Sequence, residues 1–127
     1  MKYLIDTNIA VLYLNDDKKI INKMYDNYNV FLSTISVGEL HFGFSNSKNR
    51  ENNMILLNKF FDNIDILDVN KKIAYSYSEI RLKLKAIGKP IPDNDIWIAA
   101  VAKEHDLIIV TRDKHFLDID FINTEYW

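Results

Sequence analysis

The chain has 127 residues, of which 48% are hydrophobic and 27% charged, and its formal net charge is −2. This length and composition are typical of one soluble globular domain spanning residues 1–127. The absence of cysteine excludes disulfides, thiolate zinc sites and cysteine nucleophiles and is compatible with a reducing cytoplasm. No apolar run is long enough to span a bilayer, so no membrane association is expected.

Strands and helices are predicted to alternate along the chain, from the spacing of apolar residues. Strands are expected at residues 3–6, 30–34, 64–67, 107–110 and 120–123. Helices are expected at residues 8–14, 18–28, 36–44, 50–61, 71–87 and 94–104. This alternation predicts an α/β fold with a mostly parallel central sheet and helices on both faces.

The last long helix is preceded by the strongest punctuation in the chain. Residues 88–92 read Gly-Lys-Pro-Ile-Pro, which ends the helix before them and forces an extended segment. The next helix begins with capping residues and is nearly all apolar from residue 96 to residue 102, so we expect it to be buried. Its N-terminus would then point at the edge of the sheet.

Four carboxylates stand at or beside the predicted junctions of strands and helices. They belong to Asp6, Glu39, Asp95 and Asp113. In a parallel sheet these junctions gather along one edge, where ligands bind. Four acids meeting there would repel one another unless a cation lay between them, and hard carboxylate oxygens suit Mg²⁺ or Mn²⁺. The pattern therefore indicates a hydrolase that uses a divalent metal.

Each acid also has a simpler structural explanation. Asp6 could cap the helix that follows it, and Ser36 with Glu39 has the spacing of a capping box. Asp93 or Asp95 could cap the buried helix, and Asp113 could lie in a solvated loop. Four separate caps converging on one edge are a weaker explanation than one site.

Basic residues lie near Asp95 and Asp113, and we expect them to form a cationic rim that attracts a polyanionic ligand despite the acidic cleft. This set comprises Arg81, Lys83, Lys85, Lys89, Arg112 and Lys114. A solvated helix face and loop is the alternative explanation. The three histidines, His41, His105 and His115, show no ligand spacing and are interpreted as surface or packing residues.

These segments together resemble the PIN-domain ribonucleases, specifically the VapC-type toxins of toxin–antitoxin pairs. The resemblance covers essentially the whole chain, and it is carried by the order and spacing of its motifs. They are Leu4-Ile5-Asp6-Thr7-Asn8, residues 33–40 with Glu39, residues 88–102, residues 110–116 (Val-Thr-Arg-Asp-Lys-His-Phe) and the terminal Glu125-Tyr126-Trp127.

The resemblance implies a cytoplasmic, metal-dependent endoribonuclease that a cognate antitoxin protein neutralises. It implies that Asp6 and Asp95 hold the principal Mg²⁺ or Mn²⁺ ion, while Glu39 and Asp113 complete the quartet and help orient the attacking water. It also implies that three polar residues, Thr7, Asn8 and Thr111, support the acids through hydrogen bonds. Asp93 adds a further carboxylate near the quartet.

Self-association or a protein partner is expected from two short helices that carry more apolar residues than one buried stripe needs. They carry Ile9, Val11, Leu12, Tyr13 and Leu14 in the first, and Leu40, Phe42 and Phe44 in the second. The resemblance implies that the antitoxin docks there and that the toxin forms a homodimer. Full burial by the helix at residues 71–87 and its neighbours is the alternative.

Two other functions compete with the nuclease. A haloacid-dehalogenase-type phosphotransferase also begins with an apolar strand ending in Asp, but it wants a second Asp where this chain has Asn8. The other is a catalytically silent binding module with the same fold, and the complete acidic quartet argues against it.

Overall fold

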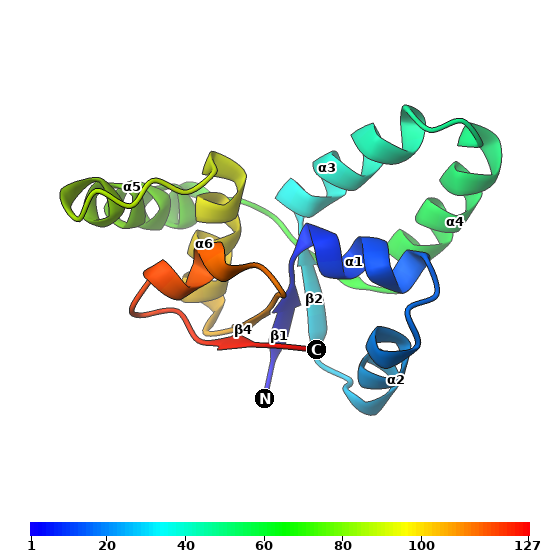
Figure 1. Cartoon of the computed structure of the whole chain (residues 1–127), viewed down its shortest axis with the longest axis horizontal. Coiled ribbons are helices and arrows are strands. Elements are labelled where there is room, and N and C mark those ends of the chain that lie inside the picture. The colour runs from blue at the N-terminus through cyan, green and yellow to red at the C-terminus, as the bar shows by residue number, and fades with distance from the viewer.

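The fold is built on one five-stranded parallel sheet (Figure 1), seen in a computed structural model that describes residues 1–127. The strand order is β3-β2-β1-β4-β5, and every pairing is parallel. The strands are β1 Tyr3–Ile5, β2 Val30–Ser33, β3 Asp65–Leu67, β4 Ile108–Val110 and β5 Thr124–Glu125. Leu4, in the central strand, pairs with Phe31 on one side and Ile109 on the other.

Helices cover both faces of the sheet, which confirms the predicted α/β fold (Figure 1). They are α1 Thr7–Leu14, α2 Lys18–Asp26, α3 Thr34–Ser45, α4 Arg50–Asp62, α5 Lys71–Ala86 and α6 Asp93–His105, with a short 3₁₀ helix η1 at Lys114–Asp118. Side chains alternate between the two faces along each strand. Leu4 therefore packs with the helices α5 and α6, whereas Tyr3 and Ile5 pack with α1 to α4.

Helix α6 is the buried helix that the sequence predicts. Six of its residues, Ile96, Ile98, Ala99, Ala100, Val101 and Ala102, are almost inaccessible to solvent. Helix α5 lies against it and contributes Ile73, Ile80 and Leu84 to the same core. This packing fixes the first turn of α6 at the carboxyl edge of the sheet.

Three local predictions are wrong. The last strand is at Thr124–Glu125 and not at residues 120–123, because η1 and the turn after it place Ile119 and Ile122 in the core before the chain can pair with β4. Helix α3 begins at Thr34, capped by the Ser33 hydroxyl, which accepts from the backbone N–H of Ser36 at 3.2 Å. The predicted Ser36–Glu39 capping box therefore does not form.

The start of α6 also differs from the prediction. Pro92 occupies the N-cap position, and no side chain caps this helix. Asp93 and Asp95 both lie in the first turn, where their charges favour the helix dipole without closing a cap. No helix of the chain has the length and apolar character that crossing a membrane requires.

Candidate active site

The four predicted acids come from four different elements that meet at the carboxyl edge of the sheet. Asp6 follows β1 directly, and Asp113 lies three residues after the end of β4. Glu39 lies in the second turn of α3, and Asp95 lies in the first turn of α6. Burial is the largest cause of the raised pKa of Asp6 and of Asp95, and neighbouring charges add to it: Asp95 and Asp113 act on Asp6, and Asp113 and Glu39 act on Asp95. The structure therefore brings all four into one acidic cluster.

Asp6 lies at the floor of this cluster, with only 4% of its surface exposed. One carboxylate oxygen accepts from the backbone N–H of Ile9 at 2.9 Å, so Asp6 caps α1 as its simpler explanation required. The other oxygen accepts from the hydroxyl of Thr111. Burial is the main reason why the pKa of Asp6 is raised, and these hydrogen bonds oppose the rise. Capping and membership of the acidic cluster are thus compatible for this residue.

Glu39 has no capping role, and its carboxylate is held from α1 instead. The hydroxyl of Thr7 donates to Glu39 Oε1 at 2.7 Å. The same hydroxyl lies 2.9 Å from the hydroxyl of Ser36. This small network ties α1 to α3 and points Glu39 toward the acids, so the capping explanation for Glu39 is wrong.

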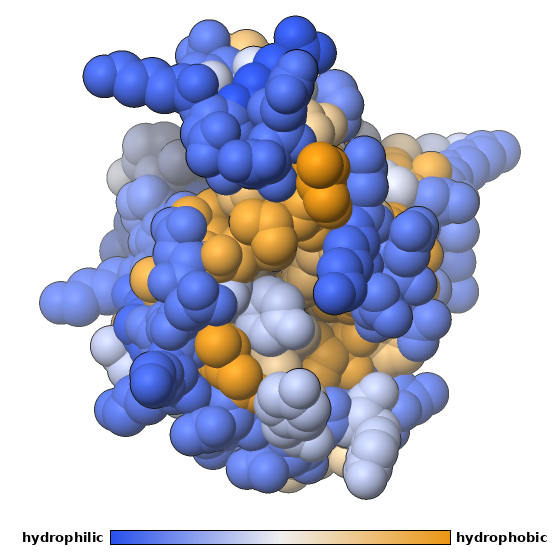
Figure 2. All heavy atoms as spheres, turned by 90° about the vertical axis from the view of Figure 1, so that its right-hand side faces the viewer, coloured by the Kyte–Doolittle hydropathy of each residue, from blue (hydrophilic) through white to orange (hydrophobic).

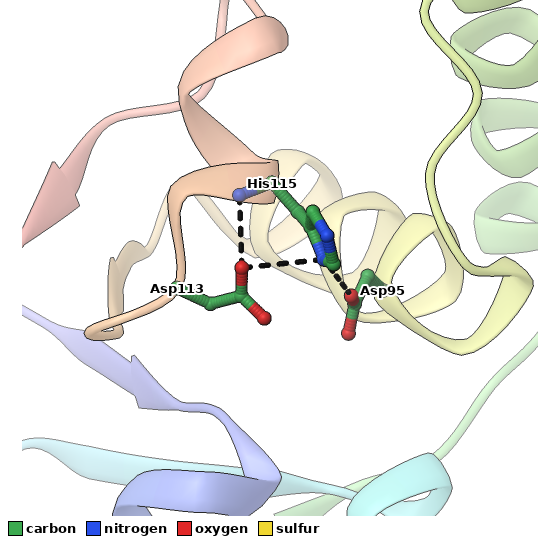
Figure 3. Close-up of side chains that lie close together, drawn as sticks. All are labelled: Asp95, Asp113 and His115. Atoms are coloured by element: carbon green, nitrogen blue, oxygen red, sulfur yellow. Dashed lines mark hydrogen bonds and ion pairs between the residues drawn. The ribbon is translucent and has the colours of Figure 1, made fainter.

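Asp95 and Asp113 face each other across the imidazole of His115 (Figure 3). The Nδ1 atom of His115 lies 3.2 Å from Oδ2 of Asp95 and 3.2 Å from Oδ1 of Asp113. Burial is the largest cause of the raised pKa of Asp95, and the hydrogen bond from His115 counteracts it. His115 is an exposed residue, as predicted, but its ring also contacts two of the four acids, which the sequence interpretation missed.

The position of His115 follows from a local turn. Asp113 caps η1, and its side chain accepts from the backbone N–H of His115 at 3.0 Å. The hydroxyl of Thr111 meanwhile accepts from the backbone N–H of Asp113 at 2.9 Å. This hydroxyl therefore holds both Asp6 and the backbone of Asp113 in place. An Asp with a His two residues later is the sequence signal that could have identified this contact.

The donor set fits a divalent cation. One ligand atom each from Asp95, Asp113 and His115 lies within 4.8 Å of the others. Burial and mutual repulsion raise the pKa of Asp6 and Asp95, and a cation among them would remove that repulsion. Carboxylate oxygens suit Mg²⁺ and Mn²⁺, and an imidazole nitrogen is tolerated better by Mn²⁺.

Comparison with known proteins places the chain in a family. The PIN-domain family model matches residues 3–122. The chain belongs to the PIN-domain family. The resemblance found in its motifs is confirmed, and the haloacid-dehalogenase alternative is wrong.

Relatives of this PIN domain match it over its whole length. It is 32% identical over 130 residues to "Ribonuclease VapC2" of Haemophilus influenzae, covering 100% of this chain and 98% of the relative. It is 29% identical over 131 residues to "tRNA(fMet)-specific endonuclease VapC" of Shigella flexneri, with the same coverage.

Solved structures also resemble the PIN domain over its whole length. It matches a structure of VapBC2 from Rickettsia felis bound to a promoter DNA fragment, with a TM-score of 0.93 and 31% identity over 100% of this chain and 99% of that one. It matches a structure of DNA-bound VapBC from Salmonella typhimurium with a TM-score of 0.95 and 28% identity, over 100% and 98% of the two chains.

Asn8 lies beside the acidic cluster, whereas Asp93 lies at the surface. Asn8 lines a cavity of about 490 Å³ together with Asp113, Lys114 and His115, although it makes no side-chain hydrogen bond. Asp93 points away from the acids. Its Oδ1 accepts from the hydroxyl of Tyr77 at 3.0 Å and lies 3.6 Å from Nη1 of Arg81.

The six predicted rim cations do not share one environment. Arg112 is a structural residue: its Nε donates to the backbone oxygen of Trp127 at 2.7 Å, and its Nη1 lies 3.5 Å from Oδ2 of Asp17. Lys83 extends over the ring of Phe121, with 4.4 Å between the ammonium and the ring centroid.

The other four cations stay close to open surface beside the acids. Lys114 lines the cavity next to Asp113. The other three, Arg81, Lys85 and Lys89, line a second cavity. Arg112 lines the cavity next to Asp113 as well, so five of the six predicted rim cations line one of these two cavities and Lys83 lines neither.

Proposed function

We propose that this protein is a metal-dependent endoribonuclease toxin, acting in the cytoplasm and neutralised by a cognate antitoxin. The observation that carries the proposal is the convergence of Asp6, Glu39, Asp95 and Asp113 in one cluster of a PIN domain. The protein's similarity over the full length to VapC ribonucleases and to VapBC complexes supports the proposal.

Asp6 and Asp95 would hold Mg²⁺ or Mn²⁺. Asp113 and His115 each place a ligand atom within 4.8 Å of one from Asp95, whereas Asp6 lies outside that group of three. Such an ion supplies a Lewis acid for a phosphoryl oxygen and makes water a stronger nucleophile at neutral pH. Its binding would also relieve the charge repulsion that raises the pKa of Asp6 and Asp95.

The chain's own residues provide orientation. Thr7 holds one oxygen of Glu39, which leaves the second oxygen free to accept a proton from the attacking water and to orient it. Thr111 fixes the rotamer of Asp6 and the backbone at Asp113 with one hydroxyl. Side chains that are held in this way lose little conformational entropy when substrate binds, so the site is preorganised.

The antitoxin would bind the face formed by α1 to α4. Figure 2 shows this side of the molecule, where apolar side chains gather in a hollow bordered by hydrophilic ones. Among the side chains of these helices, Phe42 in α3 and Ile55 and Leu56 in α4 are large, apolar and exposed. The alternative was burial by the helix at residues 71–87 and its neighbours. Helix α5 packs with α6 in the opposite core and does not cover this surface, whereas other helices cover most of it.

The remaining apolar residues of α1 and α3 are covered from within their own layer. Ile9 and Leu40 are buried, and Tyr13 packs on Phe60 of α4 with 5.4 Å between ring centroids. The exposed part of this layer is therefore the outer side of α3 and α4. We propose that it also mediates the homodimer, since exposed apolar patches of this kind mark interfaces.

The test is cleavage by the purified, antitoxin-free protein. A panel of structured RNAs that includes tRNA(fMet) is incubated in chelator and then with Mg²⁺ or Mn²⁺ restored, for the wild-type protein and for Asp95→Asn. We expect cleavage that needs the metal and is lost in the variant. A wild-type protein that stays folded and cuts none of the RNAs with either ion would favour the silent binding module.

A further inference from the structure

A cavity of about 480 Å³ lies where the end of α5, the following loop and the first turn of α6 meet. In Figure 1 this is the region where the loop from α5 returns to the top of α6. Its floor is apolar and is formed by Leu84, Ile91 and Ile96. Leu84 and Ile96 belong to the core, so the floor is rigid. A cavity of this size can accommodate a nucleobase with part of its backbone.

The rim of this cavity is cationic. Arg81, Lys85 and Lys89 line it with one acid, Asp93, which gives a local net charge of +2 from three positive groups and one negative. Arg81 pairs with Asp93 at 3.6 Å and Lys89 pairs with Asp118 at 3.2 Å. Lys85 takes part in no ion pair and no side-chain hydrogen bond, so its ammonium is free to meet an anion.

The cavity adjoins the acidic cluster through a single turn of helix. Asp93 and Ile96 line the cavity, while Asp95 between them contacts His115 in the cluster. Asp93 and Asp95 project to different sides of this turn, so an RNA strand that reaches both sites has to pass around the N-terminus of α6, where one turn rises about 5.4 Å. The uncapped N-terminus of α6 also favours negative charge at this point.

We propose that this cavity binds one unpaired nucleotide of the RNA substrate next to the scissile bond, with its phosphate on Lys85 and Lys89 and its base against Leu84, Ile91 and Ile96. Single-stranded RNA is recognised in this manner, by bases turned out of the stack and phosphates held by cations. The inference rests on the proposed ribonuclease function and adds to it a substrate-positioning site.

The experiment measures RNA binding separately from cleavage. All proteins carry Asp6→Asn so that RNA is not cut, and a fluorescent single-stranded RNA oligonucleotide of mixed sequence is titrated by anisotropy over a series of salt concentrations. Lys85→Ala is compared with Lys83→Ala, which removes the same charge from the same helix outside the cavity. Ile91→Trp fills the cavity without changing charge.

Lys85→Ala should raise Kd and make the slope of log K against log salt shallower by about 0.7, the value for one lost phosphate contact on a single strand. Lys83→Ala should change the slope by less than half as much. Ile91→Trp should raise Kd and leave the slope unchanged. Melting temperatures of all variants are measured alongside, and Ile91→Phe replaces Ile91→Trp if the latter fails to fold.

Equal effects of Lys85→Ala and Lys83→Ala, or an unchanged Kd for Ile91→Trp, would overturn the proposal. Weaker antitoxin binding with unchanged RNA binding would also overturn it, because the cavity would then serve the protein partner. Failure of the proposed function is distinct: the wild-type protein would cut no RNA, whereas the binding differences between Lys85→Ala and Lys83→Ala would persist.

Discussion

Replacing Asp6 with asparagine should stabilise the metal-free protein. The carboxylate is 4% exposed, and burial together with the charges of Asp95 and Asp113 raises its pKa in the folded state. A raised carboxyl pKa means that folding favours the protonated form, so the benefit is full below the unfolded pKa and is lost as pH rises through the folded pKa. Asparagine is neutral at every pH and keeps an oxygen for the N–H of Ile9.

The expected gain at pH 7.5 is on the order of 1 kcal/mol, a typical size for one substitution. For a domain of this length it corresponds to about 4 °C in Tm. The gain in stability should shrink as the pH is lowered toward the ordinary pKa of an aspartate, because wild-type Asp6 is then itself protonated. Metal should act in the opposite sense. At about 100 times its Kd, Mn²⁺ stabilises a protein that binds it by about 2.7 kcal/mol, or roughly 10 °C here.

Calorimetry on the antitoxin-free protein, in chelator and in Mn²⁺ at pH 5 and pH 7.5, measures both effects. Asp6→Asn should melt higher than wild type in chelator and respond little to Mn²⁺. Asp120→Asn is the matched control, since Asp120 is exposed and makes no hydrogen bond or ion pair. The reasoning would be refuted if Asp6→Asn melted lower than the wild-type protein in chelator. It would also be refuted if Mn²⁺ raised the Tm of Asp6→Asn as much as it raises that of the wild-type protein.

Three further variants test single contacts. Glu39→Gln should change the free energy of unfolding by no more than about 0.5 kcal/mol. It should lower the rate of RNA cleavage about 10- to 100-fold. A wild-type cleavage rate would show that Glu39 only packs. His115→Ala should weaken Mn²⁺ binding about tenfold by calorimetric titration, and unchanged affinity would remove His115 from the ligand set. Phe42→Asp should weaken antitoxin binding and dimerisation, seen by sedimentation, while cleavage by the isolated protein is kept; a monomeric wild type would contradict the dimer.

The sequence did not distinguish the exposed apolar residues of α1 and α3 from the buried ones. Tyr13 and Phe44 are obvious interface candidates in the sequence, but both pack into the second core and their substitution would test folding as well as binding. Phe42 is 72% exposed and offers the cleaner test. An amphipathic pattern alone could not tell these residues apart, because α4 covers part of the surface from a distant segment.

The acids themselves were predictable, because their positions depend on the ends of strands and helices. Asp6 and Asp113 follow buried strands, and the direction of a parallel sheet places such positions together. Glu39 was harder, since the sequence of α3 offers Ser36 as a cap as readily as Ser33. The structure decides between them through a hydrogen bond to the backbone of Ser36 itself.

The cations divide in a way that the sequence could have shown in part. Lys83 and Lys85 are two positions apart, about 200° around a helix, so they cannot serve one cavity, whereas Arg81 and Lys85 lie on the same face. The role of Arg112 was beyond reach, because its partners Trp127 and Asp17 are far from it in the sequence. The contact of His115 with Asp113 follows from a local turn and could have been suspected from their spacing, whereas its contact with Asp95 depends on the fold.

The most direct test of the central claim compares metal occupancy with catalysis. Binding of Mn²⁺ to the wild-type protein is followed by electron paramagnetic resonance, and the rate of RNA cleavage is measured in the same solutions across the titration. If the acidic cluster is a metal-dependent nuclease site, the two curves should coincide, and Asp95→Asn should abolish both. RNA cleavage that persists in chelator, or Mn²⁺ bound at this cluster without any cleavage, would contradict the account.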